Sequence, residues 1–195
     1  MSHYFEEDLT LKTHYRDIDI SIDGTSILLR SDSGVFSNKE VDKGSYIFVK
    51  TLLSLDLKGH VLDLGCGYGT IGICLNYFNK AIKLTYSDIN PKCVELTSFN
   101  LKRYDLDGNC LQSDGYLNIS ESFDYIVFNP PISVGKEKIY RIYSDSKAHL
   151  VPGGKLYLVI RKDKGALSHM KYLNSIGFTT NVIQKEKGYL VIECL

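Results

Sequence analysis

The sequence predicts an α/β fold in which helices cover both faces of a largely parallel sheet. Over residues 46–195, short apolar runs alternate with segments of helical period, and a chain with this alternation builds a parallel sheet. Two of the apolar runs end in turns of unusual composition, one rich in glycine after Leu64 and one with two prolines after Asn129. The length of 195 residues suits a single domain, with an extension over 1–45 before the core.

The N-terminal extension has the pattern of a β-hairpin within Asp17–Leu29. Its first strand alternates isoleucine with polar residues, and Asp23-Gly24 is typical of a tight hairpin turn. The alternating residues are Ile18, Ile20 and Ile22. A polar connector leads from Val35 to Ser45, which we expect to be the N-cap of a helix over Tyr46–Ser54.

The core elements follow from periodicity and from glycine and proline at their ends. The expected strands are Val61–Leu64, Lys83–Ser87, Asn109–Gln112, Tyr125–Phe128 and Lys155–Ile160. The expected helices are Thr70–Phe78, Pro91–Arg103, Lys138–Leu150, stopped at Pro152-Gly153-Gly154, and Ala166–Ser175. Thr179–Lys185 and Tyr189–Glu193 form a closing antiparallel hairpin around Lys187-Gly188.

Composition restricts the function. The net charge is zero, although residues 124–195 carry 11 Lys/Arg against 6 Asp/Glu and the rest of the chain is acidic. No apolar run is long enough to cross a membrane, and the acidic N-terminus is unlike a secretory signal, so we expect a cytoplasmic protein without a membrane partner. The five cysteines lack the spacing of metal ligands, so we expect reduced thiols and no metal.

The glycine-rich turn indicates a nucleoside-binding site. Gly65, Gly67 and Gly69 allow close approach of a ligand to the backbone, and their spacing is tighter than in dinucleotide-binding turns. Asp63, within the strand before the turn, could accept a hydrogen bond from the ligand's ammonium group or from water. Asp88 ends the next strand, where a carboxylate can bind a ribose diol; Asp88-Ile89-Asn90-Pro91 also has the pattern of a helix cap.

Asp114 follows the third strand and could contact an adenine amine, although a loop aspartate without such a role is equally compatible with the pattern.

The second turn, Asn129-Pro130-Pro131-Ile132, indicates transfer chemistry at a planar nitrogen. The lone pair of an exocyclic amine is delocalised into its ring, so the amine is a poor nucleophile. The side-chain oxygen of Asn129 and the carbonyl of Pro130 could accept its hydrogens and stabilise the positive charge that develops during transfer. A strand that simply ends in a Pro-Pro turn is the structural alternative.

Together these motifs resemble class I S-adenosylmethionine-dependent methyltransferases, and more narrowly the small members of the 16S rRNA guanine-N2 methyltransferase (RsmC-like) family. The resemblance extends from Ser31 to Val191 and includes Ser31–Ser37, Asp42-x-Gly44-Ser45 and Arg161–Ala166. It implies a Rossmann-like fold with a mostly parallel seven-stranded sheet. It also implies S-adenosylmethionine as cofactor and S-adenosylhomocysteine as product. The implied cofactor contacts are Asp63, Gly65, Cys66, Gly67, Gly69, Asp88, Ile89, Ser113, Asp114 and Asn129, and the implied catalytic residues are Asn129, Pro130 and Pro131.

The expected substrate is guanine N2 in ribosomal RNA or a ribosomal particle. Ile132 cannot stack on a base, unlike the aromatic residue usual in adenine-N6 and glutamine-N5 methyltransferases, although Phe128 or Tyr140 could supply a ring. Candidate phosphate contacts are Lys136, Lys138 and Arg161. The alternatives are another planar amine on protein, DNA or a small molecule, and a non-catalytic cofactor-binding partner. We expect a monomer or homodimer.

Overall fold

The computed structural model describes residues 14–35 and 40–195. The N-terminal part is the expected hairpin, with Tyr15–Ile22 (β1) antiparallel to Thr25–Asp32 (β2). Asp23 and Gly24 both have positive φ, of 49° and 84°, as a two-residue turn that matches the twist of a hairpin requires. The three alternating isoleucines are buried, so this prediction is confirmed.

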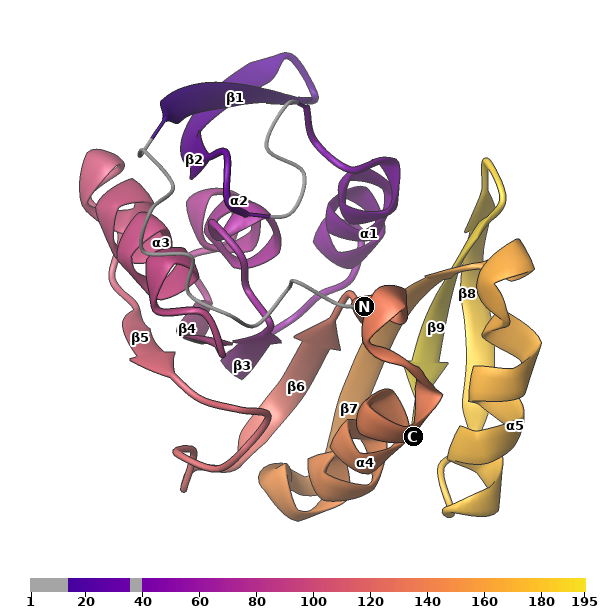
Figure 1. The fold of residues 1–195 in the computed structure, drawn as a ribbon. Coiled ribbons are helices and arrows are strands. Elements are labelled where there is room, and N and C mark those ends of the chain that lie inside the picture. Colours follow the sequence, from indigo (N-terminus) through magenta and orange to yellow (C-terminus); the bar gives the residue numbers. More distant parts are fainter. Residues whose placement is uncertain (1–13, 36–39) are drawn as a thin grey trace.

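A seven-stranded sheet forms the centre of the described molecule (Figure 1). Its strands are β3 (Gly59–Leu64), β4 (Ile82–Asp88), β5 (Asn109–Gln112), β6 (Phe123–Phe128), β7 (Leu150–Arg161), β8 (Thr180–Glu186) and β9 (Tyr189–Cys194). The order is β5-β4-β3-β6-β7-β9-β8. The strands from β5 to β7 are parallel, and β9 is antiparallel to both of its neighbours. The predicted fold class is confirmed.

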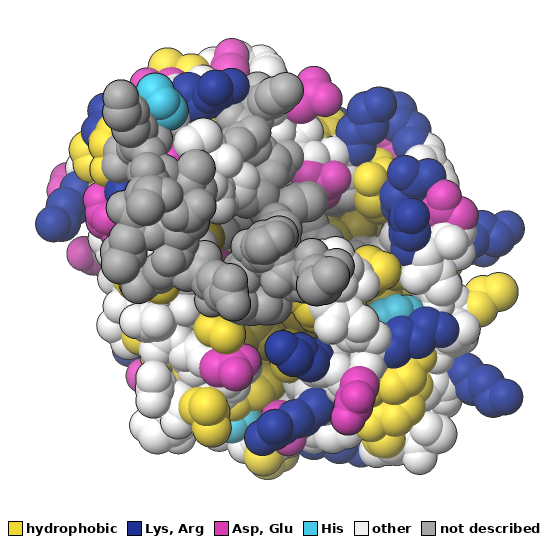
Figure 2. All heavy atoms as spheres, viewed as in Figure 1, with side chains coloured by type: hydrophobic (Ala, Val, Ile, Leu, Met, Phe, Trp, Pro, Cys, Tyr) yellow, Lys and Arg dark blue, Asp and Glu magenta, His cyan; other side chains and the backbone are white. Residues whose placement is uncertain are grey.

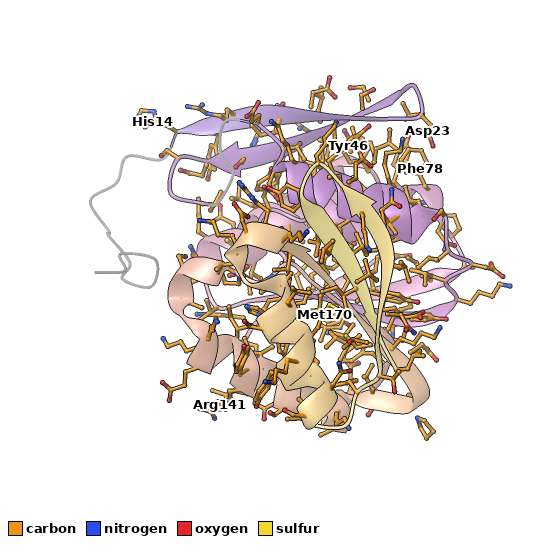
Figure 3. The ribbon with its side chains drawn as sticks, turned by 90° about the vertical axis from the view of Figure 1, so that its right-hand side faces the viewer. His14, Asp23, Tyr46, Phe78, Arg141 and Met170 are labelled. Carbon is orange, nitrogen blue, oxygen red and sulfur yellow. The ribbon has the colours of Figure 1, made fainter. Side chains whose placement is uncertain are left out.

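Two apolar clusters lie on opposite faces of this sheet. The helices are α1 (Lys43–Leu53), α2 (Thr70–Phe78), α3 (Pro91–Arg103), α4 (Lys136–Ser146) and α5 (Ala166–Ser175). The hairpin and α1–α3 cover one face together with Val61 and Val127, whereas α4 and α5 cover the other with Leu62 and Ile126. This division follows from the two-residue period of a strand. Figure 3 shows Tyr46 on the side of the hairpin and Met170 on the side of α5.

The start of α1 differs from the prediction. Asp42, not Ser45, is the N-cap, because the Asp42 side chain accepts a hydrogen bond from the Ser45 backbone N–H at 2.9 Å. Ser45 therefore lies within the first turn of a helix that begins at Lys43. Both residue types are good caps, and the prediction of Ser45 was wrong because the pattern alone does not select between them.

The end of the helix predicted over Lys138–Leu150 was also wrong. α4 ends at Ser146, a short 3₁₀ turn follows at Lys147–His149, and β7 already begins at Leu150. Leu150 pairs with Phe123, and the register of β6 and β7 shifts before Tyr125. Pro152 and Gly153 thus lie in an irregular first part of β7 that extends beyond the pairing with β9, as expected for proline in a strand.

The topology fixes where a ligand can bind. From β3 the chain proceeds outward to β4 and β5, and then returns to place β6 on the other side of β3. Ligands of open α/β sheets bind at such a reversal, outside the carboxyl ends of the strands. The glycine-rich turn follows β3 and Asn129 follows β6, so both turns lie at this reversal point.

The structure also describes the cysteines and the lengths of the helices. Each of the five cysteines is a free thiol, and four are buried. Within 14–35 and 40–195, no helix has the length and apolar character needed to cross a bilayer.

Candidate active site

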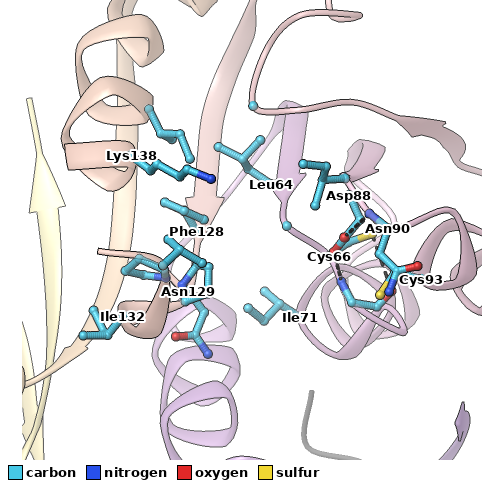
Figure 4. A pocket seen from close by; sticks show the side chains of 18 of the residues that line it. Leu64, Cys66, Ile71, Asp88, Asn90, Cys93, Phe128, Asn129, Ile132 and Lys138 are labelled. Carbon is cyan, nitrogen blue, oxygen red and sulfur yellow. Dashed lines mark hydrogen bonds between the residues drawn. The ribbon is translucent and has the colours of Figure 1, made fainter. Parts of the chain in front are cut away.

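A cavity of about 1090 Å³ opens at the reversal point of the sheet (Figure 4). Its walls come from the turns after β3, β4, β5 and β6, from the end of β7 and from α4. The predicted site residues in its wall are Gly65, Cys66, Gly67, Asp88, Ile89, Ser113, Asp114, Asn129, Pro130, Pro131, Ile132, Lys138 and Arg161. Three predicted residues do not line it: Asp63, Gly69 and Lys136. The roles of all these residues stay predictions.

The glycine-rich turn forms one wall and is held from behind by α3. Gly67 has a φ of 60°, which favours glycine, and its α-carbon faces open space. The Thr97 hydroxyl donates to the carbonyl of Gly67 at 2.9 Å, and the Asn100 side chain donates to the carbonyl of Tyr68 at 2.9 Å. Both side chains are completely buried. Sequence reasoning missed them, although polar residues three apart on the inner face of a helix were a usable signal.

Asp88 faces the cavity with both carboxylate oxygens already oriented. One accepts from the backbone N–H of Gly67 and the other from that of Asn90, each at 2.9 Å. Asn90 is the actual N-cap of α3, since it accepts from the N–H of Lys92. Burial raises the pKa of Asp88, and the two backbone donors oppose that shift. Each oxygen retains a lone pair with which it can accept from a diol.

Asp63 lies beneath the turn and is inaccessible to solvent. One of its oxygens accepts from the N–H of Gly72 at 2.8 Å, and the other has no hydrogen-bond partner among the described residues. Burial raises its pKa to about 7, against the effect of the Gly72 N–H and with a further contribution from the charge of Asp88. A buried, half-satisfied carboxyl next to a cavity is suited to a cationic or hydrogen-bonding ligand.

The residues after β5 form the far end of the cavity. Ser113 is tied to the turn after β4, since its N–H donates to the carbonyl of Asp88 at 2.9 Å. Asp114 is exposed beside it. Tyr116 and His149 stack with ring centroids 4.4 Å apart and also line the cavity. The sequence did not predict the contact of Tyr116 with His149, because the two residues are 33 positions apart and three elements lie between them.

Asn129 is held by residues from the start of α1. Its Nδ2 donates to the hydroxyl oxygen of Ser45 at 2.9 Å and to Asp42 Oδ2 at 3.4 Å. In Figure 4 the side-chain oxygen of Asn129 points toward Ile132, which lines the same cavity. Pro130 is buried and follows directly. The amide of Asn129 and the backbone of Pro130 therefore both line the cavity, directly after the end of β6.

Aromatic and cationic side chains complete the outer part of the cavity. Phe128 lines it, as does Tyr189 from the closing hairpin, whereas Tyr140 stacks on Tyr172 at 3.9 Å outside it. The prediction had not included Tyr189, because a long-range antiparallel register brings it to the site. Arg161 is paired with Asp163 through two contacts of 2.9 and 2.6 Å. The remaining basic side chains of the wall are Lys138, Arg141 and Lys164.

The chain matches a family model and several known proteins over most of its length. The family model "Methyltransferase small domain" matches residues 26–193. The Uncharacterized protein YbxB of Bacillus subtilis is 34% identical over 194 residues, which are 98% of this chain and 96% of that protein. Ribosomal RNA small subunit methyltransferase C of Actinobacillus pleuropneumoniae is 43% identical over 130 residues, which are 64% of this chain and 40% of that enzyme.

A solved structure supports the same relationship. The 16S rRNA guanine-N2 methyltransferase RsmC of T. thermophilus, in complex with AdoMet and guanosine, is similar with a TM-score of 0.77 and 26% identity. The similarity covers 92% of this chain and 50% of that one. The chain thus spans about half or less of these rRNA methyltransferases.

Proposed function

The chain belongs to the methyltransferase small domain family of S-adenosylmethionine-dependent methyltransferases, and we propose that it methylates the exocyclic N2 amine of a guanine in ribosomal RNA. The observation that carries this proposal is the orientation of Asn129 at the end of β6, with its amide nitrogen bonded to Ser45 and its oxygen toward Ile132. Such a transfer requires a site that binds a planar amine by hydrogen bonds, next to a wall that binds a nucleoside.

The residues of the glycine-rich wall fit S-adenosylmethionine. Gly67 leaves space where a side chain would stand, and Asp88 offers oriented acceptor oxygens for a ribose diol. Asp63 has a buried oxygen without a hydrogen-bond partner in the part of the chain that the structure describes. We assign Gly67 to the part of the cofactor that faces the turn and Asp88 to its ribose. Asp63 lies behind the cavity wall and would reach the ammonium group through a bound water. Bound there, the cofactor would supply an electrophilic methyl group to the neighbouring space in front of Asn129.

The protein's part in the reaction is to position and polarise the target amine. Asn129 Oδ1 and the Pro130 carbonyl accept its two hydrogens, which localises the lone pair on nitrogen and stabilises the positive charge that develops there. Bound S-adenosylmethionine would supply its methyl carbon to this nitrogen and leave as S-adenosylhomocysteine, and one amine proton would pass to water. Pre-organised acceptors of this kind contribute about 2–4 kcal/mol each to transition-state stabilisation.

Guanine in RNA is the substrate that the relatives favour. The T. thermophilus relative is an rRNA guanine-N2 methyltransferase bound to AdoMet and guanosine. Lys138 and Arg161 border the cavity and would contact phosphates, and Phe128 or Tyr189 would supply the ring that Ile132 lacks. A guanine within a duplex must be unstacked to reach such a site. We propose a cytoplasmic enzyme, monomeric or homodimeric, that acts on ribosomal RNA or a ribosomal particle.

The test is transfer of labelled methyl from S-adenosylmethionine to total RNA, ribosomal subunits, protein extract and DNA. We expect label in RNA and its recovery as N2-methylguanosine after nucleoside analysis. Asn129→Ala should bind cofactor as the wild type does and lose about 100-fold or more in turnover. Asn109→Ala, at an exposed position of β5 outside the cavity wall, serves as the matched control.

The outcomes separate the alternatives. Label in protein or DNA would retain the methyltransferase chemistry and contradict the RNA substrate. Cofactor binding without transfer to any acceptor would favour a non-catalytic binding partner. Full activity of Asn129→Ala would contradict the proposed mechanism whatever the acceptor.

A further inference from the structure

Three side chains from two distant segments form a directional chain of hydrogen bonds behind the target site. Asn129 Nδ2 lies 2.9 Å from Ser45 Oγ, and Ser45 Oγ lies 3.3 Å from Asp42 Oδ2. Asp42 Oδ2 also accepts from the Ser45 backbone N–H at 2.9 Å. The contacts of Asn129 with Ser45 and Asp42 span 84 and 87 positions of the sequence. The first turn of α1 is therefore joined to the motif at the end of β6.

The chemistry of these groups fixes the direction of the chain. An ionised carboxylate can only accept, so the Ser45 hydroxyl hydrogen is directed to Asp42. The Ser45 oxygen is then free only to accept from Asn129, so the NH₂ group, not the oxygen, must face α1. The amide oxygen of Asn129 is consequently not bonded to Ser45, and in Figure 4 it is the atom on the Ile132 side of the amide group.

Packing makes this arrangement rigid. Ser45 is 6% exposed. A β-carbon on Gly44 would lie 2.6 Å from a ring carbon of Tyr189 and 2.9 Å from Asp42 Oδ2. The first turn of α1 is therefore packed closely against Tyr189 of the closing hairpin, which limits its movement.

We propose that Ser45 and Asp42 are positioning residues of the methyl transfer, which orient Asn129 so that its oxygen, and not its NH₂ group, meets the target amine. An amide reversed by rotation would present two donors to an amine that is itself a donor. The hydrogen bond toward the carboxylate also polarises the amide, which increases the negative charge on its oxygen. Asp42 thus both caps α1 and anchors the acceptor. The inference rests on the proposed function, since it assigns Asn129 that acceptor role.

Ser45→Ala is the decisive variant, because it removes the hydroxyl group and leaves the backbone N–H that Asp42 needs for the cap. We expect kcat to fall about tenfold or more while the affinity for cofactor is unchanged, because a misplaced catalytic group slows the reacting step. Ser54→Ala, at the exposed other end of α1, is the matched control and should retain full activity. In an Asn129→Ala background, Ser45→Ala should have no further effect on kcat, because Ser45 acts through Asn129.

A purely structural role of Ser45 gives different results. It predicts equal losses from Ser45→Ala in both backgrounds, and that additivity would overturn the proposal, as would an unchanged kcat in Ser45→Ala. The cycle is measured on whichever acceptor the wild type methylates, so it does not depend on RNA being the substrate.

A second measurement keeps the inference testable if the wild type methylates nothing. In ¹⁵N-labelled protein, the side-chain amide hydrogens of Asn129 should exchange with solvent severalfold faster in Ser45→Ala than in the wild type or Ser54→Ala. Absence of methyl transfer would then count against the proposed function, and equal exchange rates in the three proteins would independently overturn the orienting role of Ser45.

Discussion

At the scale of single residues, Asp63 shows what the candidate site costs the protein. This carboxyl is buried, and one of its oxygens has no hydrogen-bond partner within residues 14–35 and 40–195. It prefers its neutral form, because burial in a low-dielectric interior penalises the charge. A ligand with an ammonium group would remove that penalty. The residue is thus better suited to the bound protein than to the free one, a pattern common at functional sites.

Asp63→Asn should therefore stabilise the free protein in a pH-dependent way. The pKa of Asp63 rises from its ordinary value of 3.8 to about 7. Above pH 3.8 the unfolded chain loses this proton while the folded protein retains it, so the wild type's free energy of unfolding falls until pH 7 and is constant above it. The advantage of the variant should grow by up to about 4 kcal/mol over that range, and its affinity for S-adenosylmethionine should fall.

Urea unfolding of both proteins at pH 4, 5.5 and 8 without cofactor measures this difference. Asp107→Asn, which changes an exposed carboxyl, should not alter the pH dependence. Parallel curves for the wild type and Asp63→Asn would mean that Asp63 is already ionised in the folded protein at low pH.

Single residues also show how far the sequence could predict the site. Asp88 and Asn129 could be located because each ends or follows a strand of clear pattern, and parallel strands bring their carboxyl ends to one edge. Ser45 belongs to the segment Asp42-x-Gly44-Ser45 that carries part of the resemblance, but its contact with Asn129 was not predicted, and Tyr189 was not assigned to the site. These contacts depend on the packing of α1 and on the register of β9. Periodicity carries local information, whereas these contacts are long-range.

At the scale of elements, α3 joins the N-terminal hairpin to the glycine-rich turn. Asn100 on α3 accepts from the N–H of Arg30 at 2.8 Å and donates to the carbonyls of Arg30 and Tyr68, each at 2.9 Å. One completely buried side chain thus satisfies backbone groups of β2 and of the glycine-rich turn. The sequence predicted the bounds of α3 correctly but not this connection, because the pattern that defines a helix does not say what its polar inner residues contact.

Asn100→Ala should consequently destabilise the protein and weaken cofactor binding together. The change leaves three backbone groups without their partner, and buried unsatisfied groups cost about 1–3 kcal/mol each before relaxation or water entry, so we expect a loss of about 2–4 kcal/mol in the free energy of unfolding. Urea unfolding and cofactor titration measure both effects. Asn109→Ala, at an exposed position of β5, is the control. Loss of stability with unchanged cofactor affinity would show that the glycine-rich turn does not depend on α3.

At the scale of the whole molecule, charge restricts how RNA can be bound. The net charge is zero, and on the face shown in Figure 2 Lys and Arg side chains are interspersed with Asp and Glu rather than joined in one basic surface. The cations of the cavity wall, Lys138, Arg141, Arg161 and Lys164, come from the more basic C-terminal part. A protein of this kind should contact few phosphates, and its affinity should depend on the shape of the site more than on general attraction.

RNA binding should accordingly show a shallow salt dependence that is set by the cavity wall. About three or four phosphate contacts to single-stranded RNA give a slope of roughly −2 to −3 for the logarithm of the association constant against that of salt concentration. Replacing Lys138, Arg161 and Lys164 by Ala should reduce that slope by about 2, because each lost phosphate contact removes about 0.7. Lys136 lies outside the wall, so Lys136→Ala alone should change the slope less than Lys138→Ala.

The matched control replaces three exposed lysines of the acidic part of the chain before residue 124, Lys50, Lys83 and Lys102. This changes the net charge by the same amount at positions outside the cavity wall. If general attraction governed binding, both triple variants would lose the same affinity and slope, and the cavity wall would not be the RNA-binding surface. If only the cavity variant changes while its affinity for S-adenosylmethionine does not, the phosphates are bound beside the Asn129 motif. A protein without net charge can then select RNA because the cations of its cavity wall lie where the base must enter.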